Sequence, residues 1–452
     1  MKYESVKTLI LIILVFTSII LTWSLWTYQP QYADKTDDLV EEIIINDPKE
    51  TASLIKPSKI LFHMNEQHFG TYDESEINKI MKYVKTWDIR ELKNISSSFV
   101  KSEYLSFLKK NGHVEIQFFD TIPLQIFKTF MNINDTEHST LSFDRIVINV
   151  YSEDHGEGTI YFVSNQDQMV YEAKVDSKFI TDFERNYYPL AIRYPEQQEQ
   201  QITETYSVFL PKDSTKTKRV DYFIDTIEIE TFIDRLFPDP TRVKKDDLTS
   251  GEVHTDGSRL LRVYDDKNYI EFINTLRIGQ EKGRTTDLIT TSIDYINGHV
   301  GWTSNFRFFE WDQNNQNTLF RLFEENYPVF NKQGQSEIIQ QWDNNEIVEY
   351  VHPTLSLEIP FKRIDTVLLS GNAVIEEIKK LPNFEPEKLE YVTIGYELQE
   401  YQDSSLNKES REFQDNSQLV TLQPIWCYRY NGTWMKLEFK EDGAGGKEDG
   451  LE

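Results

Sequence analysis

The run Thr8–Tyr28, TLILIILVFTSIILTWSLWTY, is 21 residues long and contains no charged side chain. As an α-helix it would be about 31 Å long, which matches the hydrocarbon core of a bilayer. Trp23, Trp26 and Tyr28 lie together at its C-terminal end, as aromatic side chains do at a membrane interface. The sequence therefore predicts a single transmembrane helix over residues 8–28, with these three side chains as interfacial anchors.

Charges on the two sides of this run predict its orientation. Lys2 and Lys7 precede it, whereas five acidic side chains follow it within residues 34–42. The positive-inside rule places the first seven residues in the cytoplasm and the bulk of the chain outside the cell membrane. A cleaved signal peptide is the alternative, but the apolar run is long and its exit is bulky rather than small. We therefore expect an uncleaved single-pass anchor.

The charge and composition of the 452-residue chain exclude several classes of protein. Its 48 Lys and Arg against 75 Asp and Glu give a net charge of −27, and residues 1–7 carry +1, so about −28 lies beyond the helix. A hydrophobic share of 39% is too high for an acidic disordered chain. Nucleic-acid binding is not expected, because it needs clustered Lys and Arg. A single cysteine, Cys427, cannot form an intramolecular disulfide, and we expect it to be a buried small apolar residue.

Patterning along the remaining chain predicts an α+β fold in which helices pack on antiparallel sheets. The length suggests about three extracytoplasmic domains, at roughly 150 residues each. The polar run 195–201, PEQQEQQ, lacks apolar periodicity and is the best candidate for a linker. The expected division is a cytoplasmic end 1–7, the transmembrane helix 8–28, a stalk 29–56, exterior domains 57–200, 201–310 and 311–440, and a disordered tail 441–452.

Three local patterns give sharper expectations. Asp73 followed by Glu76 predicts the start of a helix that continues to about Trp87. The pair Asn297-Gly298 predicts a hairpin between strands Leu288–Tyr295 and His299–Phe309. A helix is expected over Asn317–Asn326, stopped by Pro328.

A search for catalytic patterns finds no phosphate-binding loop, dinucleotide fingerprint, zinc-protease motif or nucleophile elbow in the sequence. His63 and His68 are five residues apart and could share a metal only in a loop, and the turn 154–157, DHGE, is an equally weak candidate. We therefore predict no catalytic residue, no metal and no cofactor, and expect that the protein is not an enzyme.

Small hydroxyl side chains within the transmembrane run point instead to association. Ser18 and Thr22 are four residues apart, and Thr17 and Ser24 lie on an adjoining face. Such side chains let helices approach closely and hydrogen-bond across the interface. We predict a partner-binding face made of Thr17, Ser18, Thr22 and Ser24; a plain lipid anchor is the alternative.

The N-terminus resembles that of the YycH family of extracytoplasmic regulators from Gram-positive bacteria. The resemblance rests on the head MKYESVKT, the anchor, and the exit TWSLWTYQP at Thr22–Pro30. It implies a non-enzymatic regulator that, with a single-pass sister protein like YycI, binds the sensor histidine kinase WalK (YycG). That kinase belongs to the WalK–WalR (YycG–YycF) two-component system, which controls cell-wall metabolism. It also implies contacts through both the transmembrane helix and the exterior domains.

Two other classes of function remain open at the level of sequence. One is an anchored exterior binding or scaffold module for cell-wall polymer or for another surface protein. The other is an anchored wall hydrolase, which would need a cleft with convergent acids.

Overall fold

The computed structural model describes residues 14–18, 48–135, 137–138, 140–154, 156–249, 251–264, 268–277, 283–285, 287–401 and 419–439. The chain divides into two compact units, residues 1–45 and residues 46–452. In the first unit, residues 14–18 are helical and exposed. Within the ranges just given, no helix has both the length and the apolar character that crossing a bilayer requires. Most of the predicted transmembrane helix lies outside the described residues.

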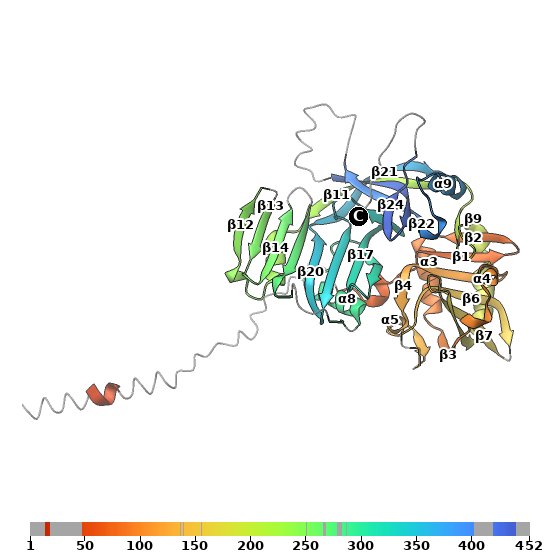
Figure 1. Cartoon of the computed structure of the whole chain (residues 1–452), viewed down its shortest axis with the longest axis horizontal. Coiled ribbons are helices and arrows are strands. Elements are labelled where there is room, and N and C mark those ends of the chain that lie inside the picture. Colours follow the sequence, from red (N-terminus) through yellow and green to blue (C-terminus); the bar gives the residue numbers. More distant parts are fainter. Residues whose placement is uncertain are drawn as a thin grey trace, which may run out of the picture. The chain divides into compact units, whose positions relative to one another are not determined.

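The larger unit begins with a ten-stranded sheet, drawn in orange to yellow in Figure 1. All neighbouring strands are antiparallel except β3 and β5. In spatial order the strands are β10 (Ser207–Pro211), β9 (Glu196–Gln201), β2 (Gln67–Thr71), β1 (Lys59–Met64), β4 (His113–Pro123), β6 (Ser142–Asp154), β7 (Glu157–Ser164), β8 (Met169–Asp176), β3 (Asp88–Asn94) and β5 (Asn132–Asn134).

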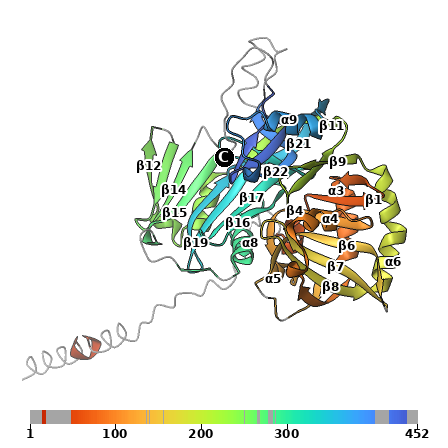
Figure 2. The ribbon, with the colours of Figure 1, turned by 45° about the vertical axis from the view of Figure 1, so that its right-hand side comes forward.

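Among the described residues, four helices accompany this sheet: α3 (Glu74–Val84), α4 (Lys101–Leu108), α5 (Leu124–Phe127) and α6 (Ser177–Asn186). Helix α2 (Thr51–Leu54) contacts strand β16 (Phe306–Asp312) of the second sheet. Helix α3 begins where the sequence predicts, because the Asp73 carboxylate accepts a hydrogen bond from the Glu76 N–H at 3.0 Å. Its apolar positions are buried in the main core. Helix α6 packs on β6, β7 and β8 and lies at the outer side of the sheet in Figure 2.

The second sheet has fourteen strands, drawn in green to blue, and is antiparallel except between β18 and β22. Its main path is β12 (Lys244–Leu248), β13 (Gly251–Thr255), β14 (Arg259–Tyr264), β15 (Tyr269–Asn274), β20 (Glu346–Pro353), β19 (Glu337–Asp343), β17 (Asn317–Glu324), β18 (Tyr327–Phe330), β22 (Leu389–Glu400), β23 (Leu419–Tyr430), β11 (Thr215–Thr226) and β21 (Leu355–Leu368). Strand β16 (Phe306–Asp312) pairs with β17, and β24 (Thr433–Lys436) pairs with β23.

Three α-helices accompany the second sheet: α7 (Ile229–Leu236), α8 (Leu288–Gly298) and α9 (Gly371–Ile378). Short 3-10 helices occupy Ser96–Ser98, Tyr188–Arg193, Pro240–Arg242, Thr275–Arg277 and Pro386–Lys388. The expected α+β class is thus confirmed, as two large and mostly antiparallel sheets with helices. The division into three exterior domains stays a prediction.

Several local predictions were wrong. The segment Leu288–Tyr295 is helical rather than extended, because its buried residues recur at helical spacing and pack into the core. Asn317–Glu324 forms strand β17, because it lies between β16 and β19 and is buried on both faces. The polar run 195–201 is not a linker: Glu196–Gln201 forms β9, whose Gln197 and Gln200 are buried.

The two sheets belong to one compact unit and share buried contacts, which we call the joint. The Arg307 guanidinium on β16 is 2% exposed and lies 2.8 Å from a carboxylate oxygen of Glu74 on α3. Phe119 on β4 packs into a cluster of second-sheet residues that includes Phe309 and Trp434. One continuous hydrophobic core contains residues from both sheets.

Candidate functional site

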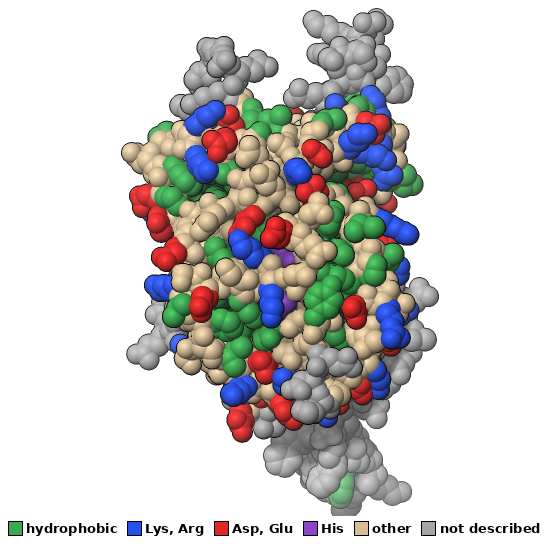
Figure 3. Space-filling view, turned by 90° about the vertical axis from the view of Figure 1, so that its right-hand side faces the viewer, with side chains coloured by type: hydrophobic (Ala, Val, Ile, Leu, Met, Phe, Trp, Pro, Cys, Tyr) green, Lys and Arg blue, Asp and Glu red, His purple; other side chains and the backbone are tan. Residues whose placement is uncertain are grey.

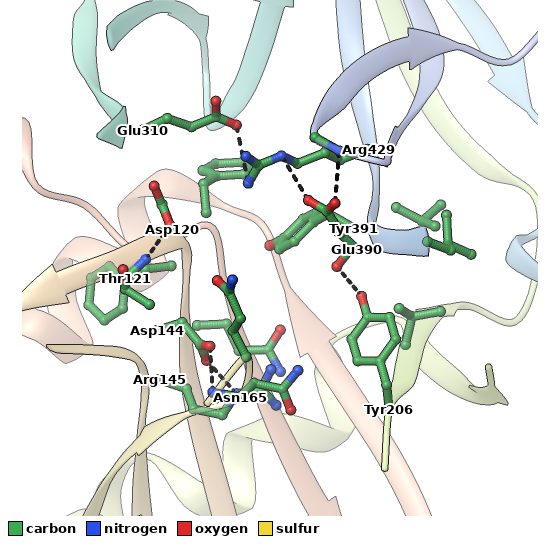
Figure 4. Close-up of a pocket in the computed structure, with 18 of the residues that line it drawn as sticks. Asp120, Thr121, Asp144, Arg145, Asn165, Tyr206, Glu310, Glu390, Tyr391 and Arg429 are labelled. Atoms are coloured by element: carbon green, nitrogen blue, oxygen red, sulfur yellow. Dashed lines mark hydrogen bonds and ion pairs between the residues drawn. The ribbon is translucent and has the colours of Figure 1, made fainter. Parts of the chain in front are cut away.

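A cleft with a volume of about 1220 Å³ lies beside the joint, and both sheets line it. From the first sheet it takes residues of β1, β4 and β6; from the second it takes residues of β16, β22 and β23. Figure 4 shows labelled side chains from both sides converging on this space. Its volume is somewhat above the range of about 300–1,000 Å³ that is usual for small-molecule pockets.

Asp120 and Trp311 connect the two sides of the cleft. One oxygen of the Asp120 carboxylate accepts from the Trp311 backbone N–H at 3.1 Å, and the other accepts from the Thr121 N–H at 2.7 Å. The Trp311 indole N–H donates to the Thr121 carbonyl at 2.8 Å. Burial, and then the nearby Glu310 carboxylate, raises the pKa of Asp120 to about 6. The carboxyl therefore titrates close to neutral pH at a contact between the sheets.

The opposite wall is held by one arginine. The Arg429 guanidinium lies 3.0 Å from Glu390 and 3.6 Å from Glu310 (Figure 4). The Tyr206 hydroxyl donates to the backbone carbonyl of Glu390, so the segment before β10 is tied to β22. These two ion pairs neutralise the Arg429 guanidinium within the wall.

The floor of the cleft follows from strand alternation. Lys59 lies opposite Gln117, and Gln117 lies opposite Arg145, so the three side chains form a row on one face of β1, β4 and β6. The intervening residues, such as Ile60 and Ile116, face the apolar core. Alternation thus places a polar row against the cleft.

Lys59 is 5% exposed, and its ammonium donates to the Phe209 carbonyl at 2.8 Å. Burial lowers the pKa of Lys59 to about 8; Glu115 raises it and Arg145 lowers it to smaller extents. Within the described part of the chain, no carboxylate lies within 4 Å of this ammonium. Arg145 differs, because it lies 2.7 Å from Glu115 and 2.8 Å from Asp144.

A buried polar chain runs on from Arg145. Glu115 is fully buried and accepts from Arg145, from Gln117 at 2.9 Å and from His63 Nε2 at 2.8 Å. Although burial alone raises it, Arg145 and the hydrogen bond from His63 hold the pKa of Glu115 at about 2. His63 Nδ1 lies 2.7 Å from Nδ1 of His68. On the side of the molecule drawn in Figure 3, a histidine side chain is visible at the surface between acidic and basic side chains.

The two histidines meet because β1 and β2 form a hairpin in which His63 and His68 lie directly opposite each other. Asn65 and Glu66 in its turn have φ of 46° and 67°. Sequence spacing alone suggested a shared site only in a loop, because the hairpin was not recognised. No group of three or more metal-ligating side chains occurs among the residues described above. Burial, and then His63, lowers the pKa of His68 to about 4, so His68 is neutral at physiological pH.

The sequence-predicted association face is only partly described. Thr17 and Ser18 lie within the helical residues 14–18. Thr22, Ser24, Trp23, Trp26 and Tyr28 lie outside the described residues. Their roles therefore stay predictions. Cys427 is buried in β23 as expected, and burial raises the pKa of its thiol.

The cleft was missed by sequence reasoning. The alternation of Glu115 and Gln117 with apolar neighbours in β4 was a usable signal for a polar face, but it is typical of any half-exposed strand. Nothing in the local pattern indicates that residues near Trp311, Tyr391 and Arg429 cover that face. Those contacts join positions 190 or more residues apart.

Comparison with known proteins identifies the family. The model described as "YycH protein, N-terminal domain" matches residues 4–187, and "YycH protein, C-terminal domain" matches residues 205–444. A Bacillus subtilis (strain 168) protein named "Two-component system WalR/WalK regulatory protein YycH" is 26% identical over 448 residues, covering 96% of each chain. The crystal structure of YycH from Bacillus subtilis shares the fold, with a TM-score of 0.70 at 22% identity, over 86% of this chain and 98% of that one. With family models matching both halves of the sequence, this chain belongs to the YycH family.

Proposed function

We propose that this protein is a non-enzymatic, membrane-anchored regulator of a WalR/WalK-type two-component system. The observation that carries the proposal is the end-to-end match to the Bacillus subtilis regulator, which covers 96% of both chains. The family model for the N-terminal domain begins at residue 4, so its match includes the N-terminal run. The YycH family models cover 4–187 and 205–444, so no large part of this chain is left for an unrelated activity.

The anchor gives a physical route for regulation. In this proposal, a signal received outside the membrane passes inward through the transmembrane helix or through a partner. Helix association would bias a kinase between two states only if this protein binds one state more tightly. We place the bulk of the chain outside the cell membrane, and we propose a WalK-type sensor kinase and a YycI-like single-pass protein as partners.

The test replaces residues 8–28 of the full chain with an unrelated single-pass sequence of the same length. Co-purification with the WalK-type kinase from membranes, and expression of wall-metabolism genes, are the two measurements. We expect loss of co-purification and altered expression. A finer variant, Thr17→Val, Ser18→Ala, Thr22→Val and Ser24→Ala together, removes the hydroxyls at nearly constant size.

The matched control changes Ile12 and Ile19 to Val in the same helix, because at helical spacing these two positions lie away from the hydroxyl face. We expect this control to behave as wild type. If the unrelated helix retains both co-purification and gene expression, regulation does not use the transmembrane contact.

A further inference from the structure

The cleft has a composition that suits a ligand rich in hydrogen-bonding groups. Amide side chains come from two turns on opposite sides: Asn165, Gln166 and Gln168 follow β7, and Gln313 and Asn314 follow β16. Amides both donate and accept, so they match a ligand that carries many hydroxyl groups. Hydroxyl side chains, among them Thr203, Thr205 and Ser207, add to the lining.

Three aromatic side chains of the lining are fixed by their polar ends. The Trp311 indole N–H bonds to Thr121, the Tyr206 hydroxyl bonds to Glu390, and the Tyr391 hydroxyl lies 2.8 Å from Ser58 Oγ. Each ring is partly exposed. A fixed, partly exposed ring offers a flat apolar surface at low entropic cost, which suits the C–H face of a sugar ring.

Within the described ranges, four cations and seven carboxylates line the cleft. Lys101 is exposed, and of the other three cations only Lys59 has no ion pair with a described residue. Arg145 is neutralised by Glu115 and Asp144, and Arg429 by Glu310 and Glu390. The buried ammonium of Lys59, on the floor, contacts a backbone carbonyl but no carboxylate of the described residues. Burying a charge without a counter-charge is costly, so a ligand that supplied an anionic group here would gain binding free energy.

We propose that this cleft binds an acidic oligosaccharide, whose carboxylate pairs with the Lys59 ammonium and whose rings pack on Tyr391, Tyr206 and Trp311. A neutral sugar would use the amides and rings but leave the ammonium unpaired. An acidic peptide would use the ammonium but offers few hydroxyl groups to the amides. The proposal does not depend on the kinase as partner, because it rests only on the cleft.

The test uses the full chain in detergent micelles and isothermal titration calorimetry at pH 7. The probes are trigalacturonic acid, its fully methyl-esterified form, triglutamate and inorganic phosphate. We expect trigalacturonic acid to bind at least tenfold more tightly than the other three probes. The ester measures what the carboxylates contribute to affinity. Triglutamate tests whether an acidic peptide binds instead, and phosphate tests whether any small anion binds.

Variants at Lys59 locate the anion. Lys59→Met should weaken trigalacturonic acid at least tenfold and leave the ester unchanged, whereas Lys59→Arg, which keeps the charge, should retain most of the affinity. Lys212→Met is the matched control, because Lys212 is half-exposed, pairs with Glu196 and does not line the cleft. Wild-type affinity should also fall above about pH 8, where Lys59 loses its proton.

Variants at Tyr391 test the ring. Tyr391→Phe removes the hydroxyl and keeps the ring, so affinity should stay within about threefold of wild type; Tyr391→Leu should lose at least fivefold. Far-ultraviolet circular dichroism checks that each variant folds. The proposal is overturned if trigalacturonic acid does not bind, if Lys59→Met binds it as wild type does, or if triglutamate or phosphate binds as tightly.

Discussion

Asp120 offers a titration that can be measured. Its pKa, raised by burial and then by Glu310, is about 6 in the folded chain, against an ordinary value of 3.8. The folded state therefore binds a proton more tightly than the unfolded state, and this group favours folding less as pH rises from about 4 to about 6. Asp120→Asn keeps the shape of the side chain and removes the charge.

We expect the free energy of unfolding of Asp120→Asn, relative to wild type, to increase by on the order of 2 kcal/mol between pH 4 and pH 7. Urea unfolding of both proteins at four pH values measures the difference, and the subtraction removes the contribution of other carboxyls. A difference that stays constant across this range would show that the pKa of Asp120 is the same in the folded and unfolded states.

The Arg145–Glu115 pair is buried, so removing one partner should be costly. Arg145→Met leaves the fully buried Glu115 carboxylate without its guanidinium, and we expect a loss of about 3–5 kcal/mol in unfolding free energy. Arg90→Met is the matched control, because Arg90 and Glu157 are exposed by 43% and 39% and lie 3.9 Å apart. Its cost should be below about 1 kcal/mol. Equal costs in urea unfolding would contradict this reading of burial.

At the scale of elements, α8 is a segment in which tertiary packing outweighs local propensity. Leu288, Ile289, Ser292, Ile293 and Ile296 are its buried residues, which is the spacing of one helix face. Ile293→Ala should cost about 2–5 kcal/mol of unfolding free energy. The exposed neighbour Asp294→Ala should change it by about 0.5 kcal/mol or less. Similar effects at the two positions in denaturant unfolding would argue against this helix face.

Local signals predicted some elements and not others, for identifiable reasons. The start of α3 was predictable, because its cap uses residues three positions apart. Segment α8 is rich in β-branched Ile and Thr and ends in Asn-Gly, so its local pattern favours a hairpin, and core packing overrides it. Strand β9 is polar, and it pairs with β10 on one side and with His68 and Phe69 of β2 on the other. Packing and strand pairing, which local propensity does not encode, thus decided the elements that were predicted wrongly.

At the scale of the whole molecule, the joint predicts cooperative unfolding. The core is continuous across both sheets, and Arg307 is buried between Glu74, Asn326 and the Glu325 carbonyl. We expect calorimetry of the full chain to show one main transition for residues 46–452, rather than three. Arg307→Met should lower its midpoint and separate it into two transitions, since it removes a buried ionic contact between the sheets. An unchanged single transition would place the coupling in the apolar core alone.

The fold class and the family were accessible from the sequence, whereas the cleft was not. Alternation and capping are local, and the exit motif Thr22–Pro30 is contiguous. The cleft depends on strands β4 and β16, which are joined by the contacts of Asp120 with Trp311 across 191 residues. No periodicity in a single sequence encodes such a pairing.

The strand pairing of β11 also determines how late in synthesis the second sheet can finish folding. This strand, Thr215–Thr226, pairs with β21 and with β23, and Thr421 bonds to Asp221 across 200 residues. At about 5–20 residues per second, synthesis of that stretch takes roughly 10–40 s. Until β21 has been made, β11 has no partner strand from the second sheet, and its pairing with β23 is completed only at the end of this interval. A nascent chain therefore passes through a period of tens of seconds in which dilution or a holding chaperone protects it from aggregation.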